Sequence, residues 1–203
     1  GMPPRGVSHL EYRHNCLVKM LDNKPFPHTL LYEKNAVPAE MNRLRAIARQ
    51  AGSIPAREAY VMDSGMAAGL GASRDQAALD MQTLAVLDVA TSHTVGATLS
   101  GGEIAGFFEY HTHDITRHRL EGLLRDLADG NLHHHQILSE GGHGCYLRKA
   151  VGFVKLEAII ATGPSRSIVD GSKLPLMYGA PMGDNMMTGT VGLLEAIQKR
   201  RNE

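Results

Sequence analysis

Residues 99–108 read LSGGEIAGFF, and this stretch decides the fold that the sequence predicts. Two glycines at 101–102 stand between runs of strand character, and glycine suits a two-residue hairpin turn because it adopts positive φ without strain. A tight turn also fixes the register of the strands beside it. The expected cross-strand pairs are Ser100 with Glu103, Thr94 with Glu109, and Ser92 with His111.

A second pair of glycines, at 141–142 in EGGH, predicts a second hairpin of the same kind. Three histidines at 133–135 would stand near the start of its first strand. Alternation of side chains along a strand prevents such a run from chelating as one unit. The expected pairs are His134 with Lys149, Gln136 with Leu147, and Leu138 with Cys145.

Apolar residues at helical spacing predict four helices in the rest of the chain. Ser73, followed three residues later by Gln76, matches a capping box and is expected to start the second helix. The segments LEAIIATG and KLPLMYG are expected to be strands near the C-terminus. The helices are expected at 38–51, 73–91, 115–129 and 188–200, and a further short strand at 57–62.

Together these elements predict an α/β fold of the α+β type. We expect a mixed, mainly antiparallel sheet containing two Gly-Gly hairpins, with helices packed on one face. Parallel pairing through the helix between the hairpins remains an alternative. The length suits a single domain over 1–203, with 1–6 as a flexible start in which Gly1, ahead of Met2, is expected to be a tag remnant.

Composition restricts the classes of function. The chain has 21 basic and 21 acidic residues, and 43% of it is hydrophobic, which is typical of a globular protein. A balanced charge leaves no electrostatic footprint for nucleic acid or an anionic membrane. No apolar run approaches the roughly 20 residues of a membrane span. Two cysteines exclude a disulfide scaffold, and we expect a cytoplasmic protein.

The segment LAVLDVA at 84–90 is apolar nearly all round if it is helical. Such a helix is buried within its domain or at a subunit interface, so the sequence predicts a homo-oligomer, most simply a dimer. Asp88 would then sit in apolar surroundings. Buried carboxylates are normally paired, so we expect Asp88 to reach a hydrogen-bond donor.

Reactive side chains are concentrated in EYHTHD at 109–114. On a regular strand, Glu109, His111 and His113 share one face, with neighbours about 7 Å apart along the backbone. Imidazole and carboxylate ligands suit a divalent metal such as Zn, Fe, Mn or Ni, and three ligands leave a position open for water or substrate. Acid–base or substrate contact without a metal is one alternative, and a solvated strand end is the other.

The stretch GGHGCYLRK offers a second group of reactive residues. His143 could hold the proton of Cys145, and Arg148 could pair with a carboxylate or phosphate of a substrate. Together with Glu109, His143 and Cys145 are therefore the candidate catalytic residues. The alternative for Cys145 is an inert buried thiol, because cysteine is among the residues most often buried.

Glycine-bearing loops supply further candidates for binding an anion. The loop at 65–73 is neither a dinucleotide nor a phosphate-loop motif, so a plain turn is the simpler interpretation. In GPSRS, Ser165 and Arg166 could hold a small anion. In GDN, Asp184 and Asn185 could contact a ligand or cap the last helix.

Two classes of function fit these residues. One is an enzyme, a metal-assisted hydrolase or lyase acting on a small anionic metabolite. The other is a non-catalytic, oligomeric metabolite-binding or regulatory protein that uses the same residues to hold a ligand. Turnover distinguishes them, whereas a bound metal alone does not.

Overall fold

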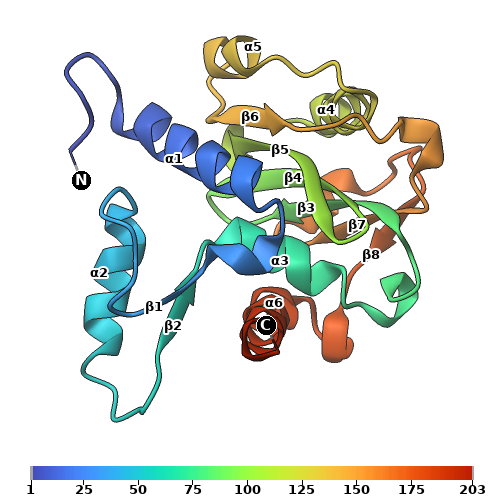
Figure 1. Cartoon of the computed structure of the whole chain (residues 1–203). Coiled ribbons are helices and arrows are strands. Elements are labelled where there is room, and N and C mark those ends of the chain that lie inside the picture. Colours follow the sequence, from blue (N-terminus) through green and yellow to red (C-terminus); the bar gives the residue numbers. More distant parts are fainter. Residues whose placement is uncertain (1, 203) are drawn as a thin grey trace.

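A mixed sheet forms the centre of the molecule, with six strands among residues 2–202, the part of the chain that this computed structural model describes (Figure 1). The strand order is β6-β5-β4-β3-β7-β8. The pairs from β6 to β3 are antiparallel, whereas β3-β7 and β7-β8 are parallel. The expected α+β class is confirmed, while the tag remnant at Gly1 lies outside the described residues. The strands are β3 (Thr83–Val89), β4 (His93–Ser100), β5 (Glu103–His111), β6 (Gly144–Leu147), β7 (Ala158–Thr162) and β8 (Leu176–Tyr178).

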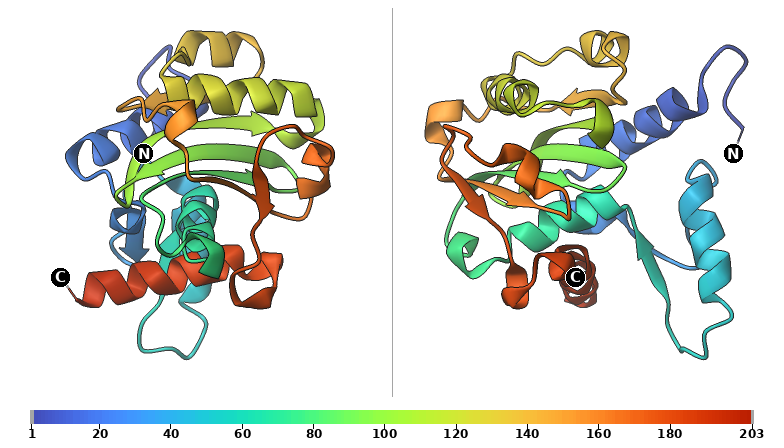
Figure 2. Two further views of the ribbon diagram at one scale, coloured as in Figure 1. Left: turned by 90° about the vertical axis from the view of Figure 1, so that its right-hand side faces the viewer. Right: turned by 180° about the vertical axis from the view of Figure 1, so that it is seen from behind.

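Helices cover both faces of this sheet, not one face as the sequence predicted. Helices α1 (His9–Asn23), α3 (Ser64–Ala72) and α6 (Thr188–Arg201) lie on one side. Helices α4 (Arg117–Asp129) and α5 (His134–Ser139) lie on the other (Figures 1 and 2). The prediction was wrong because it assigned too few helices to the residues before the first hairpin, where α1 and α3 lie.

One helix stands away from the main body (Figure 2). It is α2 (Asn42–Ala51), which is joined to the body through an antiparallel ribbon of β1 (Leu31–Glu33) and β2 (Tyr60–Met62). The helix expected at 38–51 therefore begins four residues later than predicted. None of the helices in residues 2–202 is long and apolar enough to cross a bilayer.

Alternation along the strands separates two apolar cores. On β5, Phe107 packs into the core beneath α1, α3 and α6, and Phe108 packs into the core beneath α4. The leucines of α4 are 0–1% exposed. They are Leu120, Leu123, Leu124 and Leu127. Gly130 ends α4 with φ 80°, as its place after the leucine stripe predicted.

The segment LAVLDVA belongs to strand β3, so the helix predicted at 73–91 is wrong. Ser73 caps the C-terminal end of α3 rather than starting a helix. As the strand between β4 and β7, β3 is covered by helices on both faces and its residues are buried on both sides. Such a strand reads as a continuous apolar run, which periodicity cannot distinguish from a buried helix. The apolar segment 84–90 is therefore covered within its own domain and needs no subunit contact. The dimer stays a prediction, but this segment no longer supports it.

The first Gly-Gly hairpin is present, and Ser100 pairs with Glu103 as expected. The register then shifts at a β-bulge, because Thr98 pairs with Gly106 while the next residue pairs with Ile104. One additional residue on β5 moves every later pair by one position. The predicted pairs of Ser92 and Thr94 are therefore wrong.

The second hairpin is not formed. Residues 134–139 make the short helix α5, and the turn at 140–142 leads from that helix into β6. Strand β6 pairs only with β5 within residues 2–202. The turn still uses glycine with positive φ, at Gly141 with φ 85°, but it joins a helix to a strand. The glycines correctly predicted a tight turn, but the segment before the turn is a helix and not the predicted strand.

Candidate functional site

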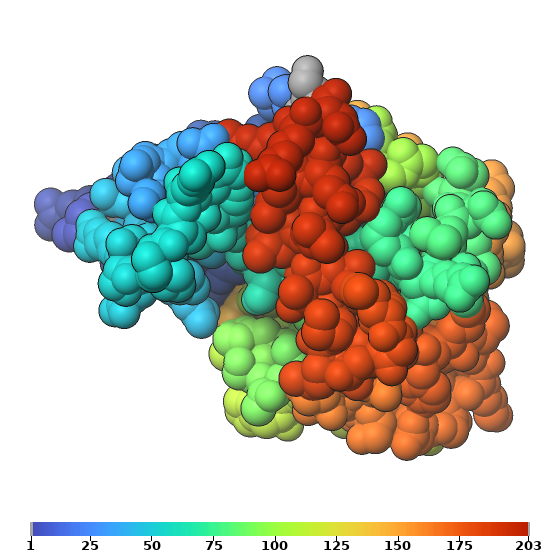
Figure 3. All heavy atoms as spheres, turned by 90° about the horizontal axis from the view of Figure 1, so that it is seen from below, coloured from blue at the N-terminus to red at the C-terminus, as the bar shows by residue number. Residues whose placement is uncertain are grey.

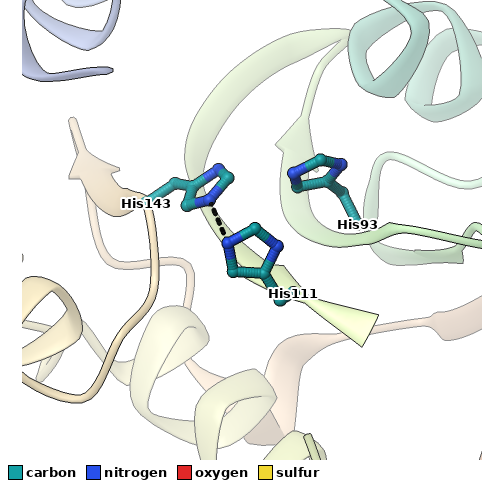
Figure 4. A group of neighbouring side chains, drawn as sticks. All are labelled: His93, His111 and His143. Atoms are coloured by element: carbon teal, nitrogen blue, oxygen red, sulfur yellow. Dashed lines mark hydrogen bonds between the residues drawn. The ribbon is translucent and has the colours of Figure 1, made fainter. Parts of the chain in front are cut away.

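Three histidines from separate segments converge where the neighbouring strands β4, β5 and β6 begin or end (Figure 4). His93 begins β4, His111 ends β5, and His143 directly precedes β6. Nε2 of His143 lies 3.0 Å from Nε2 of His111, and the ring centres of His93 lie 5.0 Å and 4.8 Å from those of His111 and His143. One ring nitrogen from each lies within 4.8 Å of the others, and all three residues are partly buried. Such a group could hold a metal ion.

The bulge in β5 creates this arrangement. After the register shift, His93 pairs directly with His111, where the regular hairpin would have placed Ser92. Thr112 then fixes the two strand ends, because its backbone N–H donates to the carbonyl of Ser92 and its Oγ1 donates to the carbonyl of Ala90 at 2.7 Å. The glycine beside the bulge, Gly106, is the sequence signal that could have revealed the shift.

A backbone hydrogen bond to β5 positions His143 beside His93 and His111. Its N–H donates to the carbonyl of Glu109 at 2.8 Å, which extends the β5-β6 pairing by one residue. Nδ1 of His143 lies 3.2 Å from Oε1 of Glu109, outside hydrogen-bond geometry, so this buried nitrogen has no hydrogen-bond partner among the described residues. His143 is therefore held by its backbone N–H and by the contact of its Nε2 with Nε2 of His111.

The carboxylate of Glu109 lies between His143 and α1. Arg13 of α1 approaches it to 3.6 Å and also pairs with Asp63 at 3.2 Å. Asp63 is the N-cap of α3, where it accepts from two backbone N–H groups. Burial alone would raise the pKa of Glu109, but the neighbouring His143, Arg13 and His93 hold it below its usual value. Glu109 is thus an ionised group that orients His143 and connects the cluster to α1.

The donor set fits a divalent transition metal. Imidazole nitrogens bind zinc at about 2.0–2.1 Å, which places the ligands of a tetrahedral site about 3.3 Å apart. The ring nitrogens of His111 and His143, 3.0 Å apart, are already near this spacing, and all three nitrogens lie within 4.8 Å of one another. The chain has two cysteines, too few for the four thiolates of an iron–sulfur cluster. Imidazole ligands in general suit zinc, copper, iron and nickel.

A cleft of about 450 Å³ opens beside the cluster, between α1, α2, the start of α3 and the ends of β3 to β5. His93, His143 and Glu109 line it together with Asp88 and Arg43. The α2 lobe that forms its outer wall projects from the body beside α6 (Figure 3). The cluster is therefore open to a small molecule from one side.

Asp88, near the end of β3, faces this cleft and is partly buried. It has no hydrogen-bond or ion-pair partner among the described residues, contrary to the expectation that it would reach a donor. Burial raises the pKa of Asp88 to about 6. Gly163 lies against it, since a Cβ there would come within 2.7 Å of Oδ1 and the residue has φ +91°. Asp88 is a carboxyl group suited to exchange a proton near neutral pH.

The other residues predicted near the cluster are placed differently. His113 lies beyond the strand end in the turn at 112–114, is exposed, and pairs with Asp114 at 3.0 Å. Cys145 packs under α4 on the opposite face of the sheet, and burial raises the pKa of its thiol to about 11. Arg148 pairs with Glu103 at the far end of β5. The structure thus joins Glu109, His111 and His143 and leaves Cys145 and Arg148 apart from them. The ring of His113 lies 5.7 Å from that of His111, but His113 is exposed and is not one of the three clustered histidines.

The predicted anion-binding loops form a separate hollow of about 640 Å³ beyond the end of β7. Arg166 and Asn185 line it, and Ser165 lies next to Arg166 without lining it. Asp184 instead accepts from the N–H of Met186 as the cap of a short helical turn. Asn185 donates to the carbonyl of Gly163 at 3.3 Å. These loops are neighbours of the cleft rather than part of it.

A second histidine pair fixes α1 against α5. The ring of His14 stacks on His134 with centroids 4.4 Å apart, and Nδ1 of His134 accepts from the N–H of Cys145. Burial, and then the charge of His134, lower the pKa of His14 to about 4. His14 is therefore neutral in the folded protein at pH values where the unfolded chain already binds a proton.

We expect stability to fall as the pH drops from about 6.5 towards 4, because unfolding then takes up a proton at His14. The loss should reach about 2 kcal/mol at pH 5 relative to pH 7 from this group. Urea unfolding of wild type and His14→Phe at the two pH values measures it. His118→Gln, at an exposed position of α4, is the control. An equal pH dependence in wild type and His14→Phe would contradict the assignment.

Comparison with curated proteins finds no match to this chain. A family model matches residues 1–168, which include α1, α2 and all three histidines of the cluster. The chain belongs to this family, DUF1786, whose description reads "Putative pyruvate format-lyase activating enzyme".

Proposed function

We propose that the protein is a metal-dependent enzyme that carries out hydrolysis or lyase chemistry on a small anionic metabolite. The observation that carries the proposal is the convergence of His93, His111 and His143 beside a cleft that His93 and His143 line. Three imidazole ligands with an open position are typical of catalytic metal sites. The description of the family also names an enzyme.

The charges that line the cleft support a cation there. Arg13 and Arg43 face four carboxylates, so the cleft carries an excess of negative charge when those carboxylates are ionised. A divalent cation would balance that excess. The carboxylates are Glu40, Asp63, Asp88 and Glu109.

The residues of the chain would divide the chemistry between them. A divalent metal supplies a Lewis acid with an open coordination position. Glu109, whose Oε1 lies 3.2 Å from Nδ1 of His143, would orient that ring, as a carboxylate commonly does for a ligating histidine. Asp88 would accept or donate the proton of the reacting group. Arg43, which has no ion pair among the described residues, would hold the anionic group of the substrate.

Metal titration with turnover tests this proposal. The chelator-treated protein is titrated with Zn²⁺, Mn²⁺, Ni²⁺ and Fe²⁺ by calorimetry, and is then assayed against esters, phosphoesters and hydroxy acids with and without metal. We expect one equivalent of metal and turnover that chelation removes. Metal binding without turnover on any substrate would favour the metabolite-binding alternative. Failure to bind any of the four metals would refute the proposal.

Asp88→Asn is expected to stabilise the protein at pH 7 by about 1–2 kcal/mol while lowering turnover. The raised pKa of Asp88 means that folding opposes its ionisation. The destabilising effect is absent below the unfolded pKa, grows as the pH rises towards 6, and is fully present above it. An amide avoids the charge but stays without a partner, so only part of the roughly 3 kcal/mol is recovered.

Thermal unfolding at pH 4 and pH 7 measures this effect, with Asp80→Asn as an exposed control. The gain from Asp88→Asn should vanish at pH 4. A loss of stability at pH 7 would mean that the carboxylate is paired in solution.

A further inference from the structure

Part of the cleft lining is apolar, although polar side chains from the strand ends also line the cleft. The side chains of one apolar wall come from α1, from α2 and its approach, and from the junction of β2 with α3. Three of them are methionines, which adapt their shape to a bound molecule. The apolar wall consists of Leu10, Met41, Leu44, Ile47, Met62 and Met66.

The apolar wall is only partly used by the fold. Met41, Met62 and Met66 are at most 9% exposed and belong to the core beneath α1 and α3. Ile47 on α2 is 56% exposed and still lines the cleft. A large apolar side chain left open beside a hollow adds little to folding and is suited to contact a ligand.

Polar groups also line the same cleft. His93, His143, Asp88 and Glu109 come from the strand ends, where Val95 and Phe107 also line the cleft, so polar groups of the sheet and the apolar wall face one hollow. Arg43 lies one residue before Leu44 on α2. The volume of the cleft, about 450 Å³, lies within the roughly 300–1,000 Å³ of pockets that hold drug-sized ligands. A metabolite of two or three carbons would leave most of this space unfilled.

We infer that the substrate is an amphipathic carboxylate, with its head group at the histidine cluster and Arg43 and an apolar body of several carbons against the apolar wall. The position of the head group rests on the proposed function, whereas the contact of the apolar body with α2 does not. Burial of each methylene strengthens binding about threefold to fourfold, so chain length should control affinity.

Two matched pairs of probes separate the two ends. Butyrate and octanoate share a carboxylate and differ by four methylenes, and 1-butanol and 1-octanol differ in the same way without a charge. Binding to the zinc-treated full-length protein is followed by NMR shifts of the methionine methyl groups. We expect octanol to bind at least tenfold more tightly than butanol, and octanoate at least tenfold more tightly than butyrate.

Ile47→Ser and Ile54→Ser form a matched pair of variants, because both isoleucines are exposed, at 56% and 61%, and only Ile47 lines the cleft. Ile47→Ser should weaken octanol and octanoate about fivefold to tenfold, and Ile54→Ser should leave both unchanged. Equal binding of the short and long probes, or an equal loss in both variants, would overturn the inference. A wild-type dimer that Ile47→Ser dissociates in light scattering would also overturn it, since a second copy would then occupy the wall.

Zinc binding and the preference for long probes test the metal site and the apolar wall independently. If zinc does not bind but octanol still binds more tightly than butanol, the apolar wall stands and the metal site fails. If zinc binds and neither long probe is preferred, the metal site stands and the amphipathic substrate is refuted.

Discussion

Gly192→Val is expected to prevent stable folding, with a loss of more than about 4 kcal/mol in the free energy of unfolding. Gly192 lies where α6 crosses α3, and a Cβ there would come within 1.8 Å of the carbonyl oxygen of Ala67. The reciprocal contact is equally close, because a Cβ on Gly71 would lie 1.8 Å from the carbonyl oxygen of Thr188. Both obstacles are backbone atoms, so no change of rotamer can relieve them. Urea unfolding followed by circular dichroism measures the loss.

Gly189→Val is the matched control for this variant. Gly189 lies one turn earlier on α6, and a Cβ there would meet nothing within 4 Å. The substitution should change stability by less than about 1 kcal/mol, the range of helix propensities. Equal stability of the two valine variants would show that the helices do not cross this closely.

The close crossing of α3 and α6 also bears on the site. Helix α3 starts at its cap Asp63, which holds Arg13, and Arg13 reaches Glu109 beside His143. The small residues of α3 therefore fix where the arginine meets the cluster. The loop expected at 65–73, a plain turn because its glycines match no anion-binding motif, is helix α3, and its Gly71 is required by the close approach of α6.

Local signals in the sequence predicted those elements whose evidence lies within one segment. The leucine stripe of α4 with its terminal Gly130, the strand β7 and the final helix α6 all lie close to the predicted bounds. Strand β3 and helix α5 were missed because their assignment depends on tertiary contacts. Both faces of β3 are covered, and the six residues of α5 are too few to show a helical period.

Local signals also predicted that some residues of the candidate site lie together. Alternation along β5 placed Glu109 and His111 on one face, and the glycine turn before β6 brought His143 to them. His93 was missed because a single additional residue in β5 changed its partner. A hairpin with a bulge and one without it differ in register by one residue. Packing across the sheet, and not the hairpin sequence alone, decides which register forms.

His93→Ala is expected to weaken zinc binding at least about 100-fold, because even the loss of an outer partner of a ligand costs roughly 10–100-fold. His93, which was missing from the predicted set, is the histidine that distinguishes the observed cluster from that set. The removal of one imidazole leaves His111 and His143, which cannot enclose a metal on three sides. Calorimetric titration of the chelator-treated protein measures the affinity.

His113→Ala is the matched control, since His113 belonged to the predicted set but is exposed and paired with Asp114. Its loss should leave zinc affinity within about twofold of wild type, because an exposed histidine outside the cluster supplies no bond to the metal. Circular dichroism of both variants establishes that each is folded before titration. If His113→Ala weakened zinc binding and His93→Ala did not, the metal would lie at the strand end, and the bulge would have no part in building the site.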